Sequence, residues 1–339
     1  MLYLTLIYSL VIISLSYCFK KKKLFSNYTG DKHQLFSNKK NIPLVGGIFL
    51  LLPIILINYQ NINYNILVIL VFLIGFFSDR KILISPKKRF LFQVTLVLFS
   101  VILLDLEIVS SRLTLFDSLL QNSTFNIIFT SFCLLILING SNFIDGLNGL
   151  LLFYMTFVIL ILLKADLLNE LKINQNLIVY LIVFMFVMIL LNLSNFLMLG
   201  DAGAYVLSFF VGYLIIKCHY SNPYVSPYFF ITLIWYPCFE NLFSIIRKLN
   251  SKFSPFTPDN NHLHQLFIQF GLKKKITKNI LALNNISSIF ISLYNFIIIF
   301  ISSLNPYSSI YQIKIIIFST SLYLLLFLSL KKNLSKKQV

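Results

Sequence analysis

Long apolar runs separated by short polar segments recur along this chain, and they decide which solvent it folds in. The runs lie near 2–19, 43–58, 62–78, 90–109, 123–138, 150–164, 176–191, 204–219, 227–246, 279–303 and 311–330. A helix needs roughly 20 apolar residues to cross about 30 Å of hydrocarbon. Only 12% of the residues are charged, against about 25% in a typical soluble domain. We therefore expect an all-α, polytopic integral membrane protein with about eleven transmembrane helices.

The lysines and arginines predict the orientation of these helices. Most of the 28 gather in the segments 20–40, 80–89, 247–278 and 331–337. These segments share one side if the N-terminus is outside, and the positive-inside rule makes that side and the C-terminus cytoplasmic. The net charge of +17 is therefore a topology signal that favours anionic lipid as a partner and argues against nucleic acid. We expect one membrane-embedded domain, 1–339, with the first run retained as a helix because its lysines follow it.

Small residues lie at the start of the second run, and one acid lies at the end of the third. Gly46 and Gly47 follow Pro43, a sequence that permits close backbone approach or simply starts a helix. Asp79 ends the third run, where it either serves a site or pairs with a neighbouring cation. Lys87 and Arg89 follow it before the fourth run.

The segment 139–149 interrupts two apolar runs without any Lys or Arg. Asn139, Asn142 and Asp145 follow one another at a spacing of three, which puts them on one face of a helix. Three oxygen-bearing side chains on one face suit a hard cation or a polyhydroxylated ligand. The alternative is a glycine-rich turn capped by Asn and Asp.

Two later segments add an acid and a histidine pair. Asp201 stands between Gly200 and Ala202, where it either meets a phosphate or caps the next helix. In the long loop, His262 and His264 follow Asp259. A His-x-His pair can bind a transition metal, but with no third such ligand nearby, contact with phosphate or substrate is the better interpretation.

Taken together, these residues predict one site at the cytoplasmic ends of the helices. Its members are Asp79, Asn142, Asp145, Asp201, Asp259, His262 and His264. Carboxylates beside histidines and cations indicate an anionic ligand held by a divalent cation, and Mg²⁺ takes one or two carboxylates together with substrate phosphates. Phosphoryl transfer needs little beyond such positioning and charge neutralisation.

The same motifs resemble a known family, the bacterial polyprenyl-phosphate N-acetylhexosamine-1-phosphate transferases, which include the phospho-N-acetylmuramoyl-pentapeptide transferases. The resemblance runs in order through Pro43…Gly46-Gly47, Ser78-Asp79…Ser85-Pro86…Arg89…Gln93, Asn139…Asn142-Phe143-Ile144-Asp145-Gly146-Leu147-Asn148-Gly149-Leu150, Leu199-Gly200-Asp201-Ala202-Gly203 and Pro258-Asp259…His262-Leu263-His264. The His-Leu-His form is closer to the branch that transfers N-acetylglucosamine-1-phosphate to undecaprenyl phosphate.

The resemblance implies a reaction and a set of roles. A UDP-N-acetylhexosamine gives its sugar-1-phosphate to undecaprenyl phosphate and releases UMP, at the cytoplasmic face of the bacterial inner membrane, as the first membrane step of cell-envelope polysaccharide synthesis such as that of lipopolysaccharide. It implies Mg²⁺, or Mn²⁺ in its place, and a homodimer by analogy. The implied metal ligands are Asp201 and Asn142, and the implied catalytic residues are Asp79, Asp145, His262 and His264. Substrate binding is implied for Gly46, Gly47, Lys87, Arg89, Asn139, Asn148, Asn192 and Asp259.

The chain departs from the family pattern at four positions. Ser78 replaces the first acid of an Asp-Asp pair, and Asn148, Ala204 and Asn260 replace the usual Asp, Ser and Arg. Two other interpretations therefore remain. A family member that binds polyprenyl phosphate without turnover would fit the missing acid at Ser78, and a transporter would fit the broken apolar runs.

Overall fold

The computed structural model describes residues 2–26, 42–171, 173–254 and 261–335. Within these ranges every regular element is a helix, apart from one isolated parallel bridge between Leu44 and Met198. The helices are α1 (Leu2–Lys21), α2 (Gly46–Ile57), α3 (Ile62–Asp79), α4 (Pro86–Leu103), α5 (Thr114–Leu120), α6 (Ser123–Ile144), α7 (Leu150–Lys164), α8 (Gln175–Leu193), α9 (Gly200–Ser221), α10 (Pro227–Leu233), α11 (Trp235–Asn250), α12 (Leu263–Lys273), α13 (Ile280–Ser303) and α14 (Ser309–Ser335). The all-helical prediction is confirmed.

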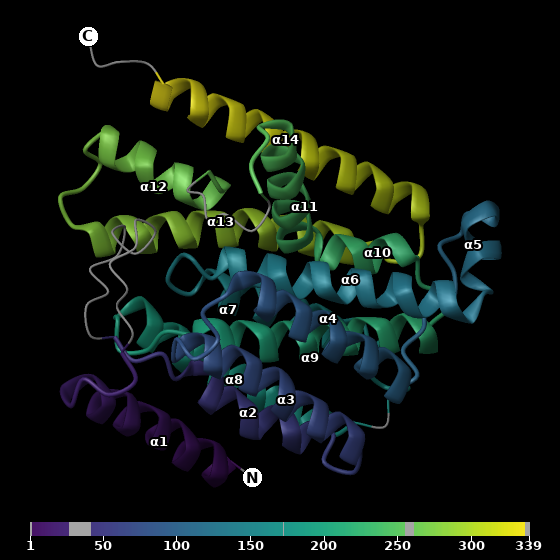
Figure 1. Cartoon of the computed structure of the whole chain (residues 1–339), viewed down its shortest axis with the longest axis horizontal. Helices are drawn as coiled ribbons and strands as arrows, with labels where there is room; N and C mark the ends of the chain where they lie inside the picture. Colours follow the sequence, from purple (N-terminus) through teal and green to yellow (C-terminus); the bar gives the residue numbers. More distant parts are fainter. Residues whose placement is uncertain (1, 27–41, 172, 255–260, 336–339) are drawn as a thin grey trace.

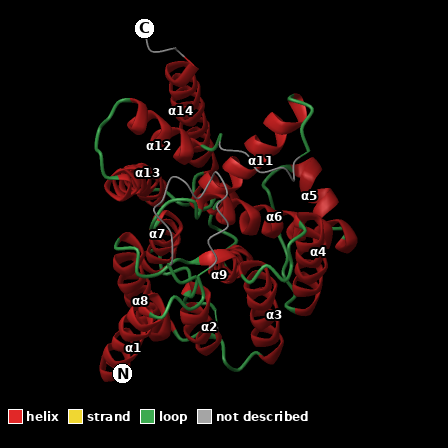
Figure 2. Ribbon diagram, turned by 60° about the vertical axis from the view of Figure 1, so that its left-hand side comes forward, coloured by secondary structure: helices red, strands yellow, loops and turns green. Residues whose placement is uncertain are grey.

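Helix α9 lies at the centre of the bundle, with α2, α3, α6 and α7 around it (Figure 2). Its residues from Ala202 to Ile216 are buried on every side, because this stretch is apolar or small all round. Helix α1 packs outside α8, where Tyr8 meets Phe184 at 4.7 Å between ring centroids. The N-terminus and α14 lie at opposite edges of the bundle (Figure 1).

Asparagine starts several of these helices. The side chains of Asn61, Asn122, Asn174 and Asn279 precede α3, α6, α8 and α13, and each accepts a hydrogen bond from the first turn. A cap of this kind contributes about 1 kcal/mol to a helix. Part of the asparagine in this apolar chain therefore serves to define where helices begin.

Within the described ranges, six helices are long and apolar enough to cross a membrane, namely α3, α6, α8, α9, α13 and α14. Helices α10 and α11 together make a seventh candidate, although they are bent by 77° at their junction. Helices α2 and α7 are apolar but shorter. The structure thus supports a multi-pass membrane protein, while eleven spans and the sides on which the termini lie remain predictions.

The bend corrects the sequence interpretation of 227–246 as one continuous run. Pro237 has no backbone N–H, so the carbonyl of Leu233 loses the donor that a continuous helix would supply. The hydroxyl of Tyr154 donates to that carbonyl at 2.8 Å instead. The chain breaks at Ile234, and α11 leaves in a new direction (Figure 1).

Candidate active site

Contacts along α9 bring its first turn to the ends of α3 and α6. Tyr64 near the start of α3 meets Tyr213 near the end of α9, with ring centroids 4.8 Å apart. At the other end of α3, a Cβ added to Gly75 would collide with the backbone of Ala202. The two helices therefore run antiparallel. Helix α6 is also antiparallel to α9, since Leu134 and Leu137 face Gly212, whereas Asp145, which follows α6, interacts with Asp79. The acids that end α3 and α6 thus come to the N-terminus of α9.

A small-residue seam lets these backbones approach one another. Its members are Gly46, Gly47, Gly75, Ala202 and Gly203. A Cβ on Gly47 would lie 2.7 Å from the backbone nitrogen of Gly203, and a Cβ on Gly46 would lie 2.7 Å from Cα of Leu199. Both glycines are buried in this backbone contact, which gives them a packing role. Their predicted contact with substrate remains a prediction.

Asp79 holds the first turn of α9. Its Oδ1 accepts a hydrogen bond from the backbone N–H of Asp201 at 2.8 Å, and its Oδ2 accepts one from Ala202 at 3.1 Å. The positive end of the helix dipole favours a carboxylate there. Gly200 makes the approach possible, since its φ is +73° and a Cβ would lie 2.6 Å from Oδ2 of Asp79. Asp79 is therefore a helix cap in this structure, a role that the alternatives weighed from the sequence did not include.

Asp201 is the carboxylate that α9 presents beside this cap. Its Oδ2 accepts hydrogen bonds from the Ser78 hydroxyl at 2.5 Å and from the Arg89 guanidinium at 2.8 Å. Arg89 also donates to the Ser78 oxygen at 2.6 Å, so the three side chains form a closed triangle. About a quarter of each charged side chain remains exposed, 23% for Asp201 and 26% for Arg89. Arg89, predicted to bind substrate, here neutralises part of the charge on Asp201.

The donor set at Asp201 fits a cation shared with a substrate. Among the described residues, no three His, Cys, Asp or Glu side chains are grouped so that they could hold a metal alone. Oδ1 of Asp201 accepts no hydrogen bond from the described residues, and the side chain is partly exposed. Asn142 is half-buried near the end of α6. Mg²⁺ commonly keeps several waters and takes one or two carboxylates plus substrate phosphates. Asp201 and Asn142 offer oxygen atoms of the kind that Mg²⁺ binds.

Three predicted site residues lie at the end of α6 or directly after it, namely Asn139, Asn142 and Asp145. Asp145 directly follows α6, is half-buried and lies close enough to Asp79 for their charges to interact. Asn139, one turn earlier than Asn142, donates to the carbonyl of Leu135 at 2.9 Å within its own helix. Asp145 therefore lies near Asp79, whereas Asn139 makes a bond local to α6.

Asn148 and Asn192 lie in buried polar contacts that shape the loops. The Asn148 backbone N–H donates to Asn284 at 2.9 Å, and its side-chain amide donates to Asn195 at 2.9 Å. Asn192 donates to the carbonyl of Leu197 at 2.8 Å and so fixes the turn that leads to α9. Both were predicted to bind substrate, and both are almost fully buried, at 2% and 4% exposed.

The remaining predicted residues lie on two other segments. Lys87 is exposed in the first turn of α4, and Asp259 lies outside the described residues. His262 and His264 begin α12 and are buried, with ring centroids 5.6 Å apart and ring planes inclined by 14°. A Cβ on Gly146 would lie 2.7 Å from Nε2 of His264, so the loop that carries Asp145 packs directly on the histidine pair.

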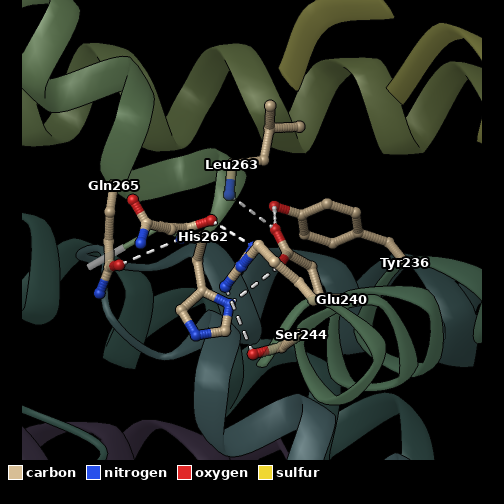
Figure 3. A network of polar contacts seen from close by, with 8 residues as sticks. Tyr236, Glu240, Ser244, His262, Leu263 and Gln265 are labelled. Carbon is tan, nitrogen blue, oxygen red and sulfur yellow. Dashed lines mark hydrogen bonds and ion pairs between the residues drawn. The ribbon is translucent and has the colours of Figure 1, made fainter. Parts of the chain in front are cut away.

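Glu240 on α11 is a residue that the predicted site did not include. Its Oε2 lies 3.0 Å from Nδ1 of His262, and its Oε1 accepts the backbone N–H of Leu263 at 3.0 Å. Figure 3 shows this carboxylate between Tyr236, His262 and Leu263. An acid inside an apolar stretch was the signal in the sequence, but its partner lies 22 residues away along the chain.

Comparison with known proteins supports the family recognised from the motifs. Residues 61–219 match the family described as glycosyl transferase family 4. An undecaprenyl-phosphate alpha-N-acetylglucosaminyl 1-phosphate transferase of Thermotoga maritima is 24% identical over 77% of this chain and 79% of its own length. Proteins of that same name from Yersinia pestis and Escherichia coli K12 are 27% identical over 23% of this chain and 21% of theirs. The matched family region contains the Ser78–Arg89–Asp201 triangle and Asp145, while the histidine pair lies beyond it.

Proposed function

Because residues 61–219 match glycosyl transferase family 4, we propose that the chain is a member of this family and transfers N-acetylhexosamine-1-phosphate from a UDP-sugar to undecaprenyl phosphate. UDP-N-acetylglucosamine is the proposed donor, since the relatives named above are N-acetylglucosaminyl 1-phosphate transferases. UMP is the second product.

One observation carries this proposal, the position of Asp201 at the N-terminus of the central helix. The backbone of this turn is fixed by Asp79, and the Asp201 side chain is oriented by Ser78 and Arg89. A helix N-terminus attracts anions through its exposed N–H groups and its dipole. A partly exposed carboxylate at that point suits a diphosphate that arrives with its divalent cation.

The chemistry is an exchange of one phosphoester partner for another. An oxygen of the lipid phosphate attacks the phosphorus that bears the sugar, the bond from that phosphorus to the UMP oxygen breaks, and UMP leaves with the electron pair. Mg²⁺ held by Asp201 and Asn142 would supply charge neutralisation at the diphosphate. His262 and His264 contact the diphosphate, Asp145 helps to hold the nucleotide, and Lys87 and Arg89 raise the local concentration of anions.

Direct attack by the lipid phosphate is the simpler route. A phosphate monoester is largely ionised near pH 7 and needs no general base. A covalent aspartyl intermediate would need a carboxylate available as nucleophile. Both oxygens of Asp79 accept backbone hydrogen bonds, which favours the direct route over one that uses this acid as nucleophile.

The proposal also includes a location. The enzyme works in the bacterial inner membrane with its site on the cytoplasmic face, in cell-envelope polysaccharide synthesis. The clustering of cations in the segments beside the site supports this orientation through the positive-inside rule. A non-catalytic protein that binds polyprenyl phosphate is the second candidate, because Ser78 provides a hydroxyl where the family resemblance leads one to expect an acid.

The test is transfer by the purified protein in detergent with Mg²⁺, undecaprenyl phosphate and radiolabelled UDP-N-acetylglucosamine. We expect labelled lipid and UMP from the wild type, and a loss of about 100-fold or more in Asp201→Asn. Asp166→Asn is the matched control, because Asp166 is exposed in the turn after α7. Folded protein that makes no lipid product from any UDP-N-acetylhexosamine would reject the transferase and favour the non-catalytic binder.

A further inference from the structure

Glu240 is a carboxylate with 0% exposed surface, and the reaction above gives it no role. Burial of a lone carboxylate is unfavourable, so buried charges in proteins are held by hydrogen-bonded partners. The contacts of Glu240 in the described part of the chain converge on the start of α12. Glu240 therefore holds a group at that helix end.

The contacts join two elements that are separate in sequence. Glu240 lies on α11, whereas His262 is the N-cap of α12 and Leu263 is the first residue of that helix. Oε2 of Glu240 lies 3.0 Å from Nδ1 of His262, and Oε1 accepts the backbone N–H of Leu263, also at 3.0 Å. Tyr236, one turn earlier on α11, places its hydroxyl 3.5 Å from Oε1. The result is a fixed attachment of the histidine segment to α11 (Figure 3).

The same contacts fix the ring of His262. Its Nδ1 faces Glu240, one face stacks on His264 with centroids 5.6 Å apart, and Phe143 lies against it at 5.0 Å. A carboxylate at one ring nitrogen orients the imidazole and stabilises its protonated form. Since Nδ1 is engaged by Glu240, a hydrogen bond from His262 to a bound diphosphate is made through Nε2.

We propose that Glu240 is a positioning residue, which holds His262 so that its Nε2–H donates to a phosphoryl oxygen of the nucleotide sugar. The inference rests on the proposed function and deepens it. Glu240 touches no substrate in this arrangement and acts entirely through the histidine. The 77° bend between α10 and α11 gives α11 the direction that carries Glu240 to the segment before α12.

A double-mutant cycle between Glu240 and His262 tests the proposal. Glu240→Gln keeps the shape and removes the charge, and we expect kcat/KM for UDP-N-acetylglucosamine to fall about 10- to 100-fold, largely through KM. His262→Gln retains an amide in place of Nε2 and removes Nδ1. In that background Glu240→Gln should change kcat/KM by less than about twofold, because the path from Glu240 to the substrate is already broken.

Asn241 offers the matched control on the same helix. It is also buried, and its side chain donates to the carbonyl of Ile136 at 3.1 Å, away from the contacts described for the histidine pair. Asn241→Ser should lower thermal stability, leave kcat/KM within about threefold of wild type and combine multiplicatively with His262→Gln. An equal loss in Asn241→Ser and Glu240→Gln, or a multiplicative loss in the Glu240–His262 double variant, would assign Glu240 a merely structural role and overturn the proposal.

A second measurement uses the unaltered protein. In ¹⁵N-histidine-labelled wild type, the signals of His262 are those absent from His262→Gln, and we expect protons on both ring nitrogens, with Nδ1–H hydrogen-bonded to Glu240 and Nε2–H available as a donor. A neutral ring, protonated at only one of its nitrogens, would contradict the proposal even if every Glu240 variant failed to fold. Because this measurement needs no turnover, loss of the transferase assignment and loss of the positioning role can be told apart.

Discussion

Asp79, the last residue of α3, accepts the backbone N–H of Asp201 at 2.8 Å and so fixes the start of α9. The two acids have divided their tasks. Asp79 directs both oxygens at the backbone, while Asp201 directs its side chain at Ser78 and Arg89. The candidate metal ligand is thus supported by the acid next to it.

Replacement of the supporting acid should cost stability. Asp79→Asn leaves one acceptor for two backbone donors and removes the charge at the helix N-terminus, so we expect a loss of about 1–2 kcal/mol. Thermal unfolding in detergent measures it, with Asp166→Asn as the control for loss of an exposed acid. An unchanged unfolding temperature for Asp79→Asn would show that the cap contributes nothing.

Gly200→Ala should destabilise the protein more than Gly149→Ala. Both glycines have a left-handed backbone, with φ of +73° and +75°, so each alanine pays about 1 kcal/mol of backbone strain. At Gly200 the new Cβ would also lie 2.6 Å from Oδ2 of Asp79, whereas at Gly149 it would meet the side chains of Phe153 and Leu193 at 3.3 Å and 3.5 Å. We expect a total near 2–3 kcal/mol at Gly200. Equal unfolding temperatures for the two variants would remove the predicted clash with Asp79.

Arg89→Gln should lower transfer without unfolding the protein. The guanidinium bonds both Asp201 and Ser78, and loss of a charge-assisted hydrogen bond of this kind corresponds to about 10- to 100-fold in kcat/KM. Lys88→Gln is the matched control, since Lys88 is exposed in the same turn of α4. Similar losses in the two variants would indicate a general effect of surface charge rather than the triangle.

Ser78 decides between the transferase and the non-catalytic binder. Its hydroxyl lies 2.5 Å from Oδ2 of Asp201, so Ser78→Ala in an active enzyme should cost about 10-fold in kcat/KM. In a binder without turnover, there is no transferase activity for Ser78→Ala to lower. In that case Ser78→Asp should create lipid product. Activity that appears only in Ser78→Asp would therefore reverse our assignment.

A pH effect is expected at the far end of the bundle. Burial would raise the pKa of Asp117, but hydrogen bonds from Ser111 and Ser110 outweigh it and hold the pKa below its ordinary value. A depressed pKa contributes stability above the unfolded pKa, near 4, and this contribution is lost as the pH falls through the folded value. The difference in unfolding temperature between wild type and Asp117→Asn should therefore shrink between pH 5 and pH 3. A constant difference would argue against the Ser–Asp contacts.

The sequence predicted the class of fold well, because apolar runs of helical length leave few alternatives. It also led us to expect Asp79, Asp145 and Asp201 near one another, since all three follow or precede apolar runs. It did not predict that Asp79 would cap α9 while Asp201 bonds Ser78 and Arg89. A sequence records an acid at a helix end, whereas the use of both Asp79 oxygens as a cap depends on how closely α3 and α9 approach.

Two features escaped prediction for a related reason. The break between α10 and α11 depends on Tyr154, which takes over the carbonyl that Pro237 leaves unbonded from more than 70 residues away. Glu240 likewise finds its partner only after the chain has turned back from α11 to α12. Pairings of this kind are set by tertiary packing and carry no periodic signal along the chain.

The small-residue seam leaves little choice of side chain at its glycine positions. At Gly46, Gly47 and Gly75 a single added carbon would lie within the contact distance of another helix's backbone, and backbone cannot swing aside as a side chain can. In a library that randomised each position, these three should return glycine alone. Such a library would identify the seam positions as clearly as the acids of the site, although the seam glycines contribute only the space that a side chain would fill.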